Sequence, residues 1–207
     1  MSHNLYLYPK FIRLWHFINA VMFLLLIVTG LSMQYTAPDS PLIRFDIAVK
    51  LHDIGGITVS INYLLFLMGN MVTDNGKYYR IQAKGFTTEL KGQFRYYIWG
   101  IFKGEAPPYP ISKDRKFNPL QKLSYVLVMY MGMPVIILTG LALFFPQVFD
   151  LLGLGSLIVA DVIHVLMGIV LTMFMLIHLY FSTFGRTMFS NFKSIISGWH
   201  ESSQAPG

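Results

Sequence analysis

Four long apolar stretches divide the chain, and the few polar residues gather mainly between them. Each stretch is long enough to cross the ~30 Å hydrocarbon core of a membrane, which takes a helix of about 20 residues. The pattern therefore predicts an all-α integral membrane protein, a four-helix bundle that forms a single membrane domain over residues 1–207. The predicted transmembrane helices cover about residues 14–33, 54–72, 123–145 and 158–184.

The long segment between the second and third spans has an amphipathic pattern of its own. Apolar residues recur there at helical spacing and polar residues fall between them, which predicts a helix lying on the membrane surface. A plain solvated loop is the alternative. The apolar positions are Leu90, Phe94, Tyr97, Ile98 and Ile101, and the polar ones are Lys91, Gln93, Arg95 and Lys103.

Composition supports a membrane location and narrows the possible cofactors. Only 13% of the residues are charged and 54% are hydrophobic, whereas about a quarter of an ordinary soluble domain is charged. The chain has no cysteine, which excludes disulfides, thiolate-ligated haem, covalent haem attachment and iron–sulfur clusters held by this chain. Any metal must therefore be bound by histidine or oxygen.

Basic residues are distributed unevenly among the connections. Fourteen of the 16 lie before the first span, between the second and third, or after the fourth, where Arg186 and Lys193 stand. By the positive-inside rule these segments, both termini included, are expected in the cytoplasm of a bacterial or archaeal cell. In this setting the net charge of +6 marks one face of the bilayer, so we expect no nucleic-acid partner.

Four of the six histidines lie within or at the edge of the apolar spans, where an ionisable side chain is costly and usually functional. His164 and His178 are 14 residues apart in the last span, which puts them on nearly the same helix face at depths ~21 Å apart. Given the expected directions of the helices, His52 should be level with His164 and His16 with His178. The histidines thus form two pairs, one in each leaflet.

Two histidines on facing helices can supply both axial ligands of a haem iron. Small residues follow the four histidines by four positions, which would leave room for a flat porphyrin or, alternatively, allow close helix packing. Zinc usually needs three or four ligands at one point. A proton relay would have few carboxylates to continue it, with only Asp53 and Asp161 near the outer edge. The small residues are Ala20, Gly56, Gly168 and Ser182.

Several short motifs occur in a characteristic order along nearly the whole chain. Together they resemble the cytochrome b subunits of membrane-bound formate dehydrogenases, thiosulfate reductases and nickel–iron hydrogenases, within a cytochrome b561-like superfamily. The carriers are Arg13-Leu14-Trp15-His16, Thr29-Gly30, Leu51-His52, Gly55-Gly56, Lys116-Phe117-Asn118-Pro119-Leu120-Gln121-Lys122, His164, His178-Leu179-Tyr180 and Gly185-Arg186-Thr187.

The resemblance implies two haems b, one held by His16 and His178 on the cytoplasmic side and one by His52 and His164 on the outer side. It also implies a menaquinone site near the inner haem that uses Asn118. Phe117 departs from the family, since some relatives have tyrosine at that position. The two histidine pairs that the resemblance implies are the same pairs that the depths of the histidines in the membrane predict.

Polar residues near the inner edge are the candidates for quinone or haem propionate contacts: Asn118, Gln121, Lys122 and Arg13. A quinone pocket needs a few such groups in apolar surroundings. Each has another interpretation. Asn118 with Pro119 is typical of a helix N-terminus, Lys122 could anchor the span at the head groups, and Arg13 could pair with a propionate.

These observations predict an electron-transfer subunit that is not catalytic alone. We expect it to connect a membrane quinone, menaquinone or ubiquinone, with an iron–sulfur protein at the outer face and a molybdenum, tungsten or nickel–iron enzyme beyond it. Two alternatives stay open: a stand-alone dihaem enzyme exchanging electrons between quinone and a small oxidant such as superoxide, and a haem-free anchor or transporter with structural histidines.

Overall fold

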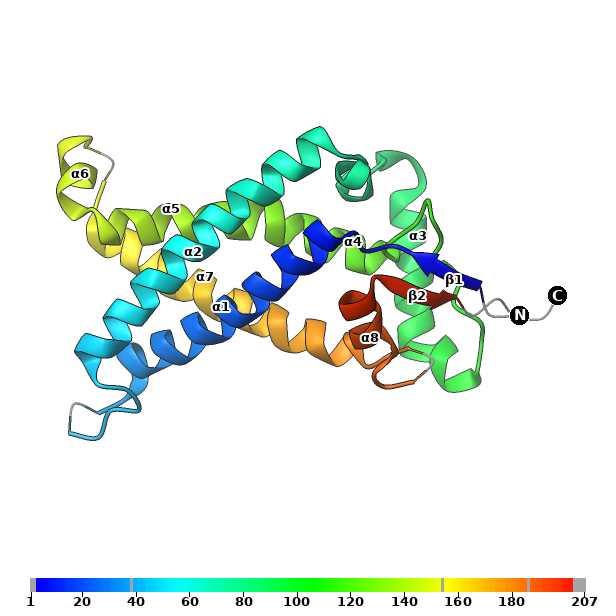
Figure 1. Cartoon of the computed structure of the whole chain (residues 1–207), viewed down its shortest axis with the longest axis horizontal. Helices are drawn as coiled ribbons and strands as arrows, with labels where there is room; N and C mark the ends of the chain where they lie inside the picture. The colour runs from blue at the N-terminus through cyan, green and yellow to red at the C-terminus, as the bar shows by residue number, and fades with distance from the viewer. Residues whose placement is uncertain (1–2, 38, 154, 186, 203–207) are drawn as a thin grey trace. The chain divides into compact units, whose positions relative to one another are not determined.

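The computed structural model describes residues 3–37, 39–153, 155–185 and 187–202, so Arg186 lies outside the described residues. Within this part, four helices are long and apolar enough to cross a membrane (Figure 1). The prediction of an all-α membrane bundle is confirmed. The four spans are Lys10–Tyr35 (α1), Phe45–Val72 (α2), Pro119–Phe144 and Leu157–Ser182 (α7).

The first three observed spans begin four to nine residues before the predicted apolar stretches, and the fourth matches its stretch to within two residues. α2 begins nine residues before the stretch that starts at residue 54, because Asp46 and Lys50 interrupt the apolar run without interrupting the helix. The third span is composite: α4 (Pro119–Leu127), a π-helical turn η4 (Val128–Gly132) and α5 (Met133–Phe144) follow without a break. Pro134 lacks a backbone N–H, and the wider turn before it accommodates the missing helical hydrogen bond.

The chain forms two compact units, which we describe separately. The first contains the described parts of Met1–Arg13, Gly69–Met129 and His178–Gly207, and the second contains Leu14–Met68 and Tyr130–Ile177. In the second unit, segments of all four spans lie together, with the short helix α6 (Pro146–Leu151) before α7 (Figure 1).

Hydrogen bonds join α1 to α2 in the second unit. The Trp15 indole donates to the Asn62 carbonyl (3.0 Å), and the Asn62 side chain donates back to the Trp15 carbonyl (3.1 Å). Trp15 also stacks on Phe66, which is 1% exposed. Near the other end of α1, Ser32 Oγ bonds both backbone groups of Ile43, which lies in the connection two residues before α2. These contacts hold α1 against α2 and against the segment that leads into it.

The first unit contains a strand pair and surface helices. β1 (His3–Tyr6) pairs antiparallel with β2 (Trp199–Ser202), so segments from the two ends of the chain meet. The sequence pattern did not predict these strands. The short helix α8 (Ser190–Ser197) ends at Gly198, which has a φ of +89° and begins the turn into β2. The Gly198 carbonyl accepts hydrogen bonds from the backbone N–H groups of Leu7 and Tyr8.

The segment between α2 and α4 is largely helical, as its amphipathic pattern predicts. It contains η1 (Asp74–Tyr79), α3 (Ala83–Arg95), η2 (Tyr96–Gly100) and η3 (Ile101–Lys103). One face buries Gln93, and the other exposes a row of large apolar side chains. The exposed residues are Phe94, Ile98, Trp99 and Phe102.

Candidate functional site

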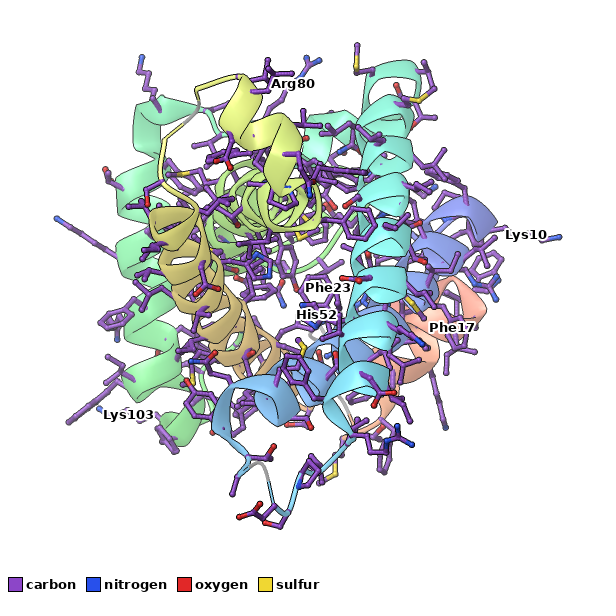
Figure 2. The ribbon with its side chains drawn as sticks, turned by 90° about the vertical axis from the view of Figure 1, so that its left-hand side faces the viewer. Lys10, Phe17, Phe23, His52, Arg80 and Lys103 are labelled. Atoms are coloured by element: carbon purple, nitrogen blue, oxygen red, sulfur yellow. The ribbon has the colours of Figure 1, made fainter. Side chains whose placement is uncertain are left out.

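His52 on α2 and His164 on α7 lie side by side in the second unit. Their ring centroids are 6.1 Å apart and the ring planes are inclined by 72°. Two imidazoles that share a metal ion, each through a nitrogen at about 2 Å, have centroids about 6 Å apart. Figure 2 shows His52 and Phe23 pointing inward, whereas Phe17 lies at the periphery. The pair therefore has the spacing of two axial ligands.

Thr29 on α1 fixes the orientation of His52. Its hydroxyl donates to the Leu25 carbonyl (2.8 Å), with Leu26 O also near (3.2 Å). Because the single hydroxyl proton points to its own helix, the oxygen accepts from Nδ1–H of His52 at 2.9 Å. The neutral imidazole then has its lone pair on Nε2, the atom available to a metal.

Thr139 on α5 repeats this arrangement at His164. Its hydroxyl donates to the Val135 carbonyl (2.8 Å) and accepts from Nδ1–H of His164 at 3.0 Å. The Nε2 lone pair of His164 is therefore available in the same way. A hydrogen bond of this kind to the second ring nitrogen is the usual support of a metal-ligating histidine.

Each threonine is followed by a glycine that lets the imidazole lie against the helix. A Cβ at Gly30 would lie 3.5 Å from His52 Cε1, and a Cβ at Gly140 would lie 3.1 Å from His164 Cε1. The contact at Gly140 is the tighter of the two. Thr29-Gly30 and Thr139-Gly140 are thus two copies of one supporting element, each on the membrane span that precedes the span of its histidine.

Gly56 and Gly168, four residues after the paired histidines, border open space. A Cβ built at either glycine meets no atom within 4 Å, whereas a Cβ at Gly55 would lie 3.1 Å from Leu26 of α1. Close helix packing therefore explains Gly55 but neither Gly56 nor Gly168. Room beside both ligands is what a flat porphyrin requires.

His178 belongs to the first unit and has a different support. The Tyr125 hydroxyl lies 3.3 Å from its Nδ1, and the two ring centroids are 5.8 Å apart. His16 belongs to the second unit. It directly follows Trp15, whose indole is hydrogen-bonded to Asn62 of α2. The pairing of His16 with His178 stays a prediction.

Two of the quinone candidates serve the start of α4. Asn118 Oδ1 accepts from the Gln121 backbone N–H (2.9 Å), and Gln121 Oε1 accepts from the Asn118 N–H (3.1 Å), a reciprocal capping box with Pro119 at the first helical position. Asn118 Nδ2 also donates to the Tyr97 hydroxyl (2.9 Å). The helix-cap interpretation of Asn118 is confirmed.

The other two candidates differ in their surroundings. Nε of Arg13 is buried and has no hydrogen-bond partner among the described residues. Lys122 lies in the first turn of α4, on the wall of a pocket in the first unit. These two side chains keep donors that a ligand could use.

Lys116 is a buried cation that the sequence did not single out as functional. It is 2% exposed, and its Nζ lies 4.8 Å from the Tyr8 ring centroid and 5.2 Å from that of Tyr78. It also donates to Asn75 Oδ1 at 3.3 Å. Burial lowers the pKa of Lys116 to about 8 and raises the pKa of Tyr8 to about 12.

The donor groups suit a cofactor held by two ligands. Among the described residues, no three His, Cys, Asp or Glu side chains gather at one point. A membrane bundle with two inward histidines, each presenting Nε2 beside a glycine that borders open space, has the features of a b-type cytochrome.

The comparisons with known proteins agree. Residues 7–198 match the family described as prokaryotic cytochrome b561, and the chain belongs to this family. It is 37% identical over 199 residues, 96% of this chain and 76% of the relative, to a protein of Escherichia coli (strain K12) described as "Putative cytochrome YdhU". No solved structure matches significantly. The chain is thus a multi-pass prokaryotic membrane haem protein, which implies electron transfer.

Proposed function

We propose that this cytochrome holds two haems b and carries electrons between a quinone and an iron–sulfur partner at the outer face of the membrane. The observation that carries the outer haem is the repeated arrangement at His52 and His164, with matched threonine bonds and open space beside both ligands. Its location in a bundle of apolar helices supports conduction across the bilayer.

In this proposal His52 and His164 bind the outer haem iron, and His16 and His178 bind the inner one. Bound haem supplies reversible one-electron oxidation and reduction. Thr29 and Thr139 hold the outer ligands in the orientation that presents Nε2, and the Tyr125 hydroxyl contacts Nδ1 of His178. These hydroxyl groups orient the ligands and support their basicity.

We place the quinone near the inner haem, at the start of α4. Asn118 and Gln121 are engaged in capping that helix, so their contribution is to fix its first turn. Arg13 and Lys122 are the better candidates for direct contact with a quinone carbonyl or a haem propionate, because Arg13 Nε is buried without a partner among the described residues.

The partner is proposed from the positive-inside rule and the family resemblance. The basic segments lie in the cytoplasm in this proposal, so His52 and His164 face the outer side, where an iron–sulfur subunit would dock. A molybdenum, tungsten or nickel–iron enzyme beyond that subunit would supply or consume the electrons.

The test is a haem count on purified protein together with single histidine variants. A pyridine haemochrome assay should give two haems b per chain, and His52→Ala or His164→Ala should leave one. His16→Ala or His178→Ala should remove the other haem, and redox titration of the variants should then give the potential of each haem separately.

Loss of the same haem in all four variants would contradict the pairing. A folded protein without haem would favour an anchor or transporter. Full quinone-linked activity without any co-purifying polypeptide would favour the stand-alone oxidoreductase.

A further inference from the structure

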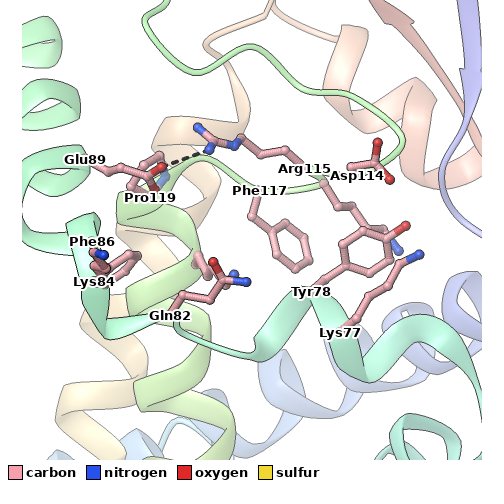
Figure 3. Close-up of a pocket in the computed structure, with 12 residues that line it drawn as sticks. Lys77, Tyr78, Gln82, Lys84, Phe86, Glu89, Asp114, Arg115, Phe117 and Pro119 are labelled. Carbon is pink, nitrogen blue, oxygen red and sulfur yellow. Dashed lines mark hydrogen bonds and ion pairs between the residues drawn. The ribbon is translucent and has the colours of Figure 1, made fainter.

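A second candidate site lies in the first unit, apart from the histidines. It is a pocket of about 200 Å³ with walls from η1, from α3 and from the segment that leads into α4 (Figure 3). We call it the basic pocket. Lys77 and Tyr78 lie at one side of the pocket and Lys84 and Phe86 at the other, with Phe117 between them.

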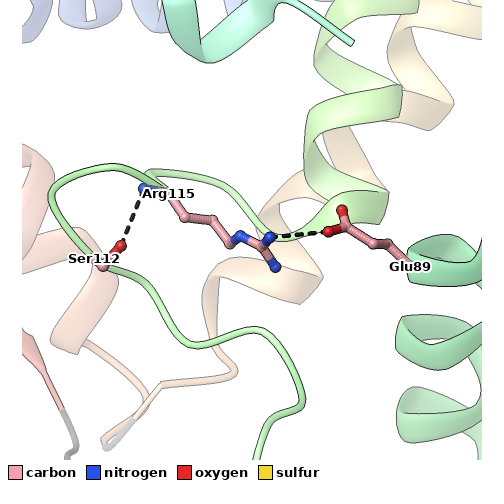
Figure 4. Close-up of polar contacts among 3 residues, drawn as sticks. All are labelled: Glu89, Ser112 and Arg115. Carbon is pink, nitrogen blue, oxygen red and sulfur yellow. Dashed lines mark hydrogen bonds and ion pairs between the residues drawn. The ribbon is translucent and has the colours of Figure 1, made fainter. Parts of the chain in front are cut away.

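The charge of the basic pocket is strongly positive. Five of its lining residues are Lys or Arg and two are acidic. One acid, Glu89, is bound by Arg115 at 2.9 Å, and the backbone N–H of Arg115 donates to Ser112 Oγ at 3.1 Å (Figure 4). The lining cations are Lys77, Lys84, Arg115, Lys116 and Lys122.

Lys116 gives the pocket a buried cation without an anionic partner. Among the described residues, no carboxylate lies within ion-pair distance of its Nζ, whose neighbours are the Asn75 amide oxygen and the rings of Tyr8 and Tyr78. A buried charge is costly unless it is paired. Lys116 also lines the pocket, and an anion bound there would reduce that cost.

The position of the pocket along the chain indicates which anion. α2, the second span, ends at Val72 just before η1, and the third span begins at Pro119, which itself lines the pocket. Residues that directly follow one span and begin another lie at the level of the lipid head groups. Basic pockets at this level bind the head groups of anionic lipids.

We propose that the basic pocket binds the phosphate group of an anionic phospholipid. Lys77, Lys84 and Arg115 would contact the phosphate, and the rings of Phe86 and Phe117 would offer apolar surface to the glycerol and the first methylene groups. Inorganic phosphate shares the binding chemistry, but it lacks the acyl chains that concentrate a lipid at this depth.

The test uses the whole protein in nanodiscs of phosphatidylcholine, with or without an equal part of phosphatidylglycerol. Retained phosphatidylglycerol is measured by native mass spectrometry after exchange into detergent. The pocket variant is Lys77→Gln with Lys84→Gln. The control is Lys91→Gln with Lys103→Gln, which removes the same charge. Each double variant also removes one lysine that lies over an aromatic ring, Lys77 over Tyr78 in the pocket variant and Lys103 over Trp99 in the control.

The wild-type protein and the control should retain phosphatidylglycerol, and the pocket variant should bind it about a hundredfold more weakly, since each direct hydrogen bond to a charged group contributes about a tenfold factor. If the double variant does not fold, Lys84→Gln alone, an exposed position, should show about a tenfold loss.

Equal weakening in the pocket variant and the control would show general surface attraction and overturn the proposal. Displacement of phosphatidylglycerol by inorganic phosphate at similar concentration would assign the pocket to soluble phosphate instead. Neither result depends on haem content, so the proposed electron-transfer function is tested separately.

Discussion

The histidines of the two units are supported in different ways. In the second unit, His52 and His164 each receive a threonine oxygen at 2.9–3.0 Å, and the threonine proton is used within its own helix. In the first unit, His178 has a tyrosine hydroxyl at 3.3 Å. A helix-bound threonine can only accept from the ring, whereas a tyrosine hydroxyl can donate or accept. The threonines therefore fix the tautomer of His52 and His164, whereas the tyrosine contact alone does not fix that of His178.

The largest expected effect concerns the open space beside Gly56 and Gly168 in the second unit. Gly56→Leu or Gly168→Leu should fill that space and abolish most binding of the outer haem, while the protein still inserts and folds. Haem content per chain and a melting curve of the protein measure the two effects. Gly55→Leu is the matched control.

Because a side chain at position 55 would meet Leu26, the control should destabilise the α1–α2 contact and reduce the yield of folded protein. Normal haem content in Gly56→Leu would show that the porphyrin does not use this space.

The next effect comes from the threonines. Thr29→Val or Thr139→Val keeps the side-chain shape but leaves the buried Nδ1–H without an acceptor, which costs about 1–3 kcal/mol. Loss of such a support typically weakens metal binding by about 10–100-fold. We expect a loosely held outer haem with a shifted potential and an unchanged inner haem, measured by redox titration.

Thr58→Val is the control, because Thr58 donates only to its own helix, at Ile54 O (2.7 Å). If Thr58→Val and Thr29→Val shift the outer haem equally, the hydrogen bond to His52 has no special role.

In the first unit, the buried Lys116 should make stability depend on pH. Its pKa of about 8 in the folded chain is below the value of 10.5 for a free lysine, so the unfolded chain binds more protons between these values. Stability should therefore rise between about pH 8 and 10, by about 2 kcal/mol. Above pH 10 the raised pKa of Tyr8, about 12, acts in the opposite direction.

Chemical unfolding across this pH range measures the effect, and Lys116→Met should remove most of it. A slope that persists in Lys116→Met would mean that another group titrates.

The smallest effect separates the two glycines that touch the ligands. Gly140→Ala places a methyl group 3.1 Å from the His164 ring and should displace it by a few tenths of an ångström, whereas Gly30→Ala makes an ordinary 3.5 Å contact with His52. We expect a change in the electron paramagnetic resonance signal of the oxidised outer haem for Gly140→Ala and little change for Gly30→Ala. The reverse order would contradict the packing described.

Hydropathy predicted the spans because the hydrocarbon thickness sets a minimum length that few soluble helices meet. It also located the four histidines, since each is an ionisable group in an apolar stretch. It could not predict β1 and β2, because two four-residue strands from opposite ends of the chain pair only through tertiary structure. It could not show that Thr29 serves His52, because threonine in a helix ordinarily bonds its own backbone.

The repeated Thr-Gly dipeptides were the available signal for the ligand supports. They precede His52 and His164 by 23 and 25 residues, a spacing that the end of one span, a connection and the start of the next span would give. Lys116 offered no such signal, since its burial depends on Tyr8 and Tyr78 from distant parts of the chain.

The adjacent Gly55 and Gly56 have a consequence for how variation in this chain can be read. Gly55 allows α2 to pack closely against Leu26 of α1, and Gly56 borders the space proposed for the porphyrin. In a mutant library grown without haem synthesis, larger residues should accumulate at position 56 and stay excluded at position 55. Restoring haem synthesis, with selection for respiration, should remove them from position 56 as well. Two neighbouring codons would thus record two separate selective pressures.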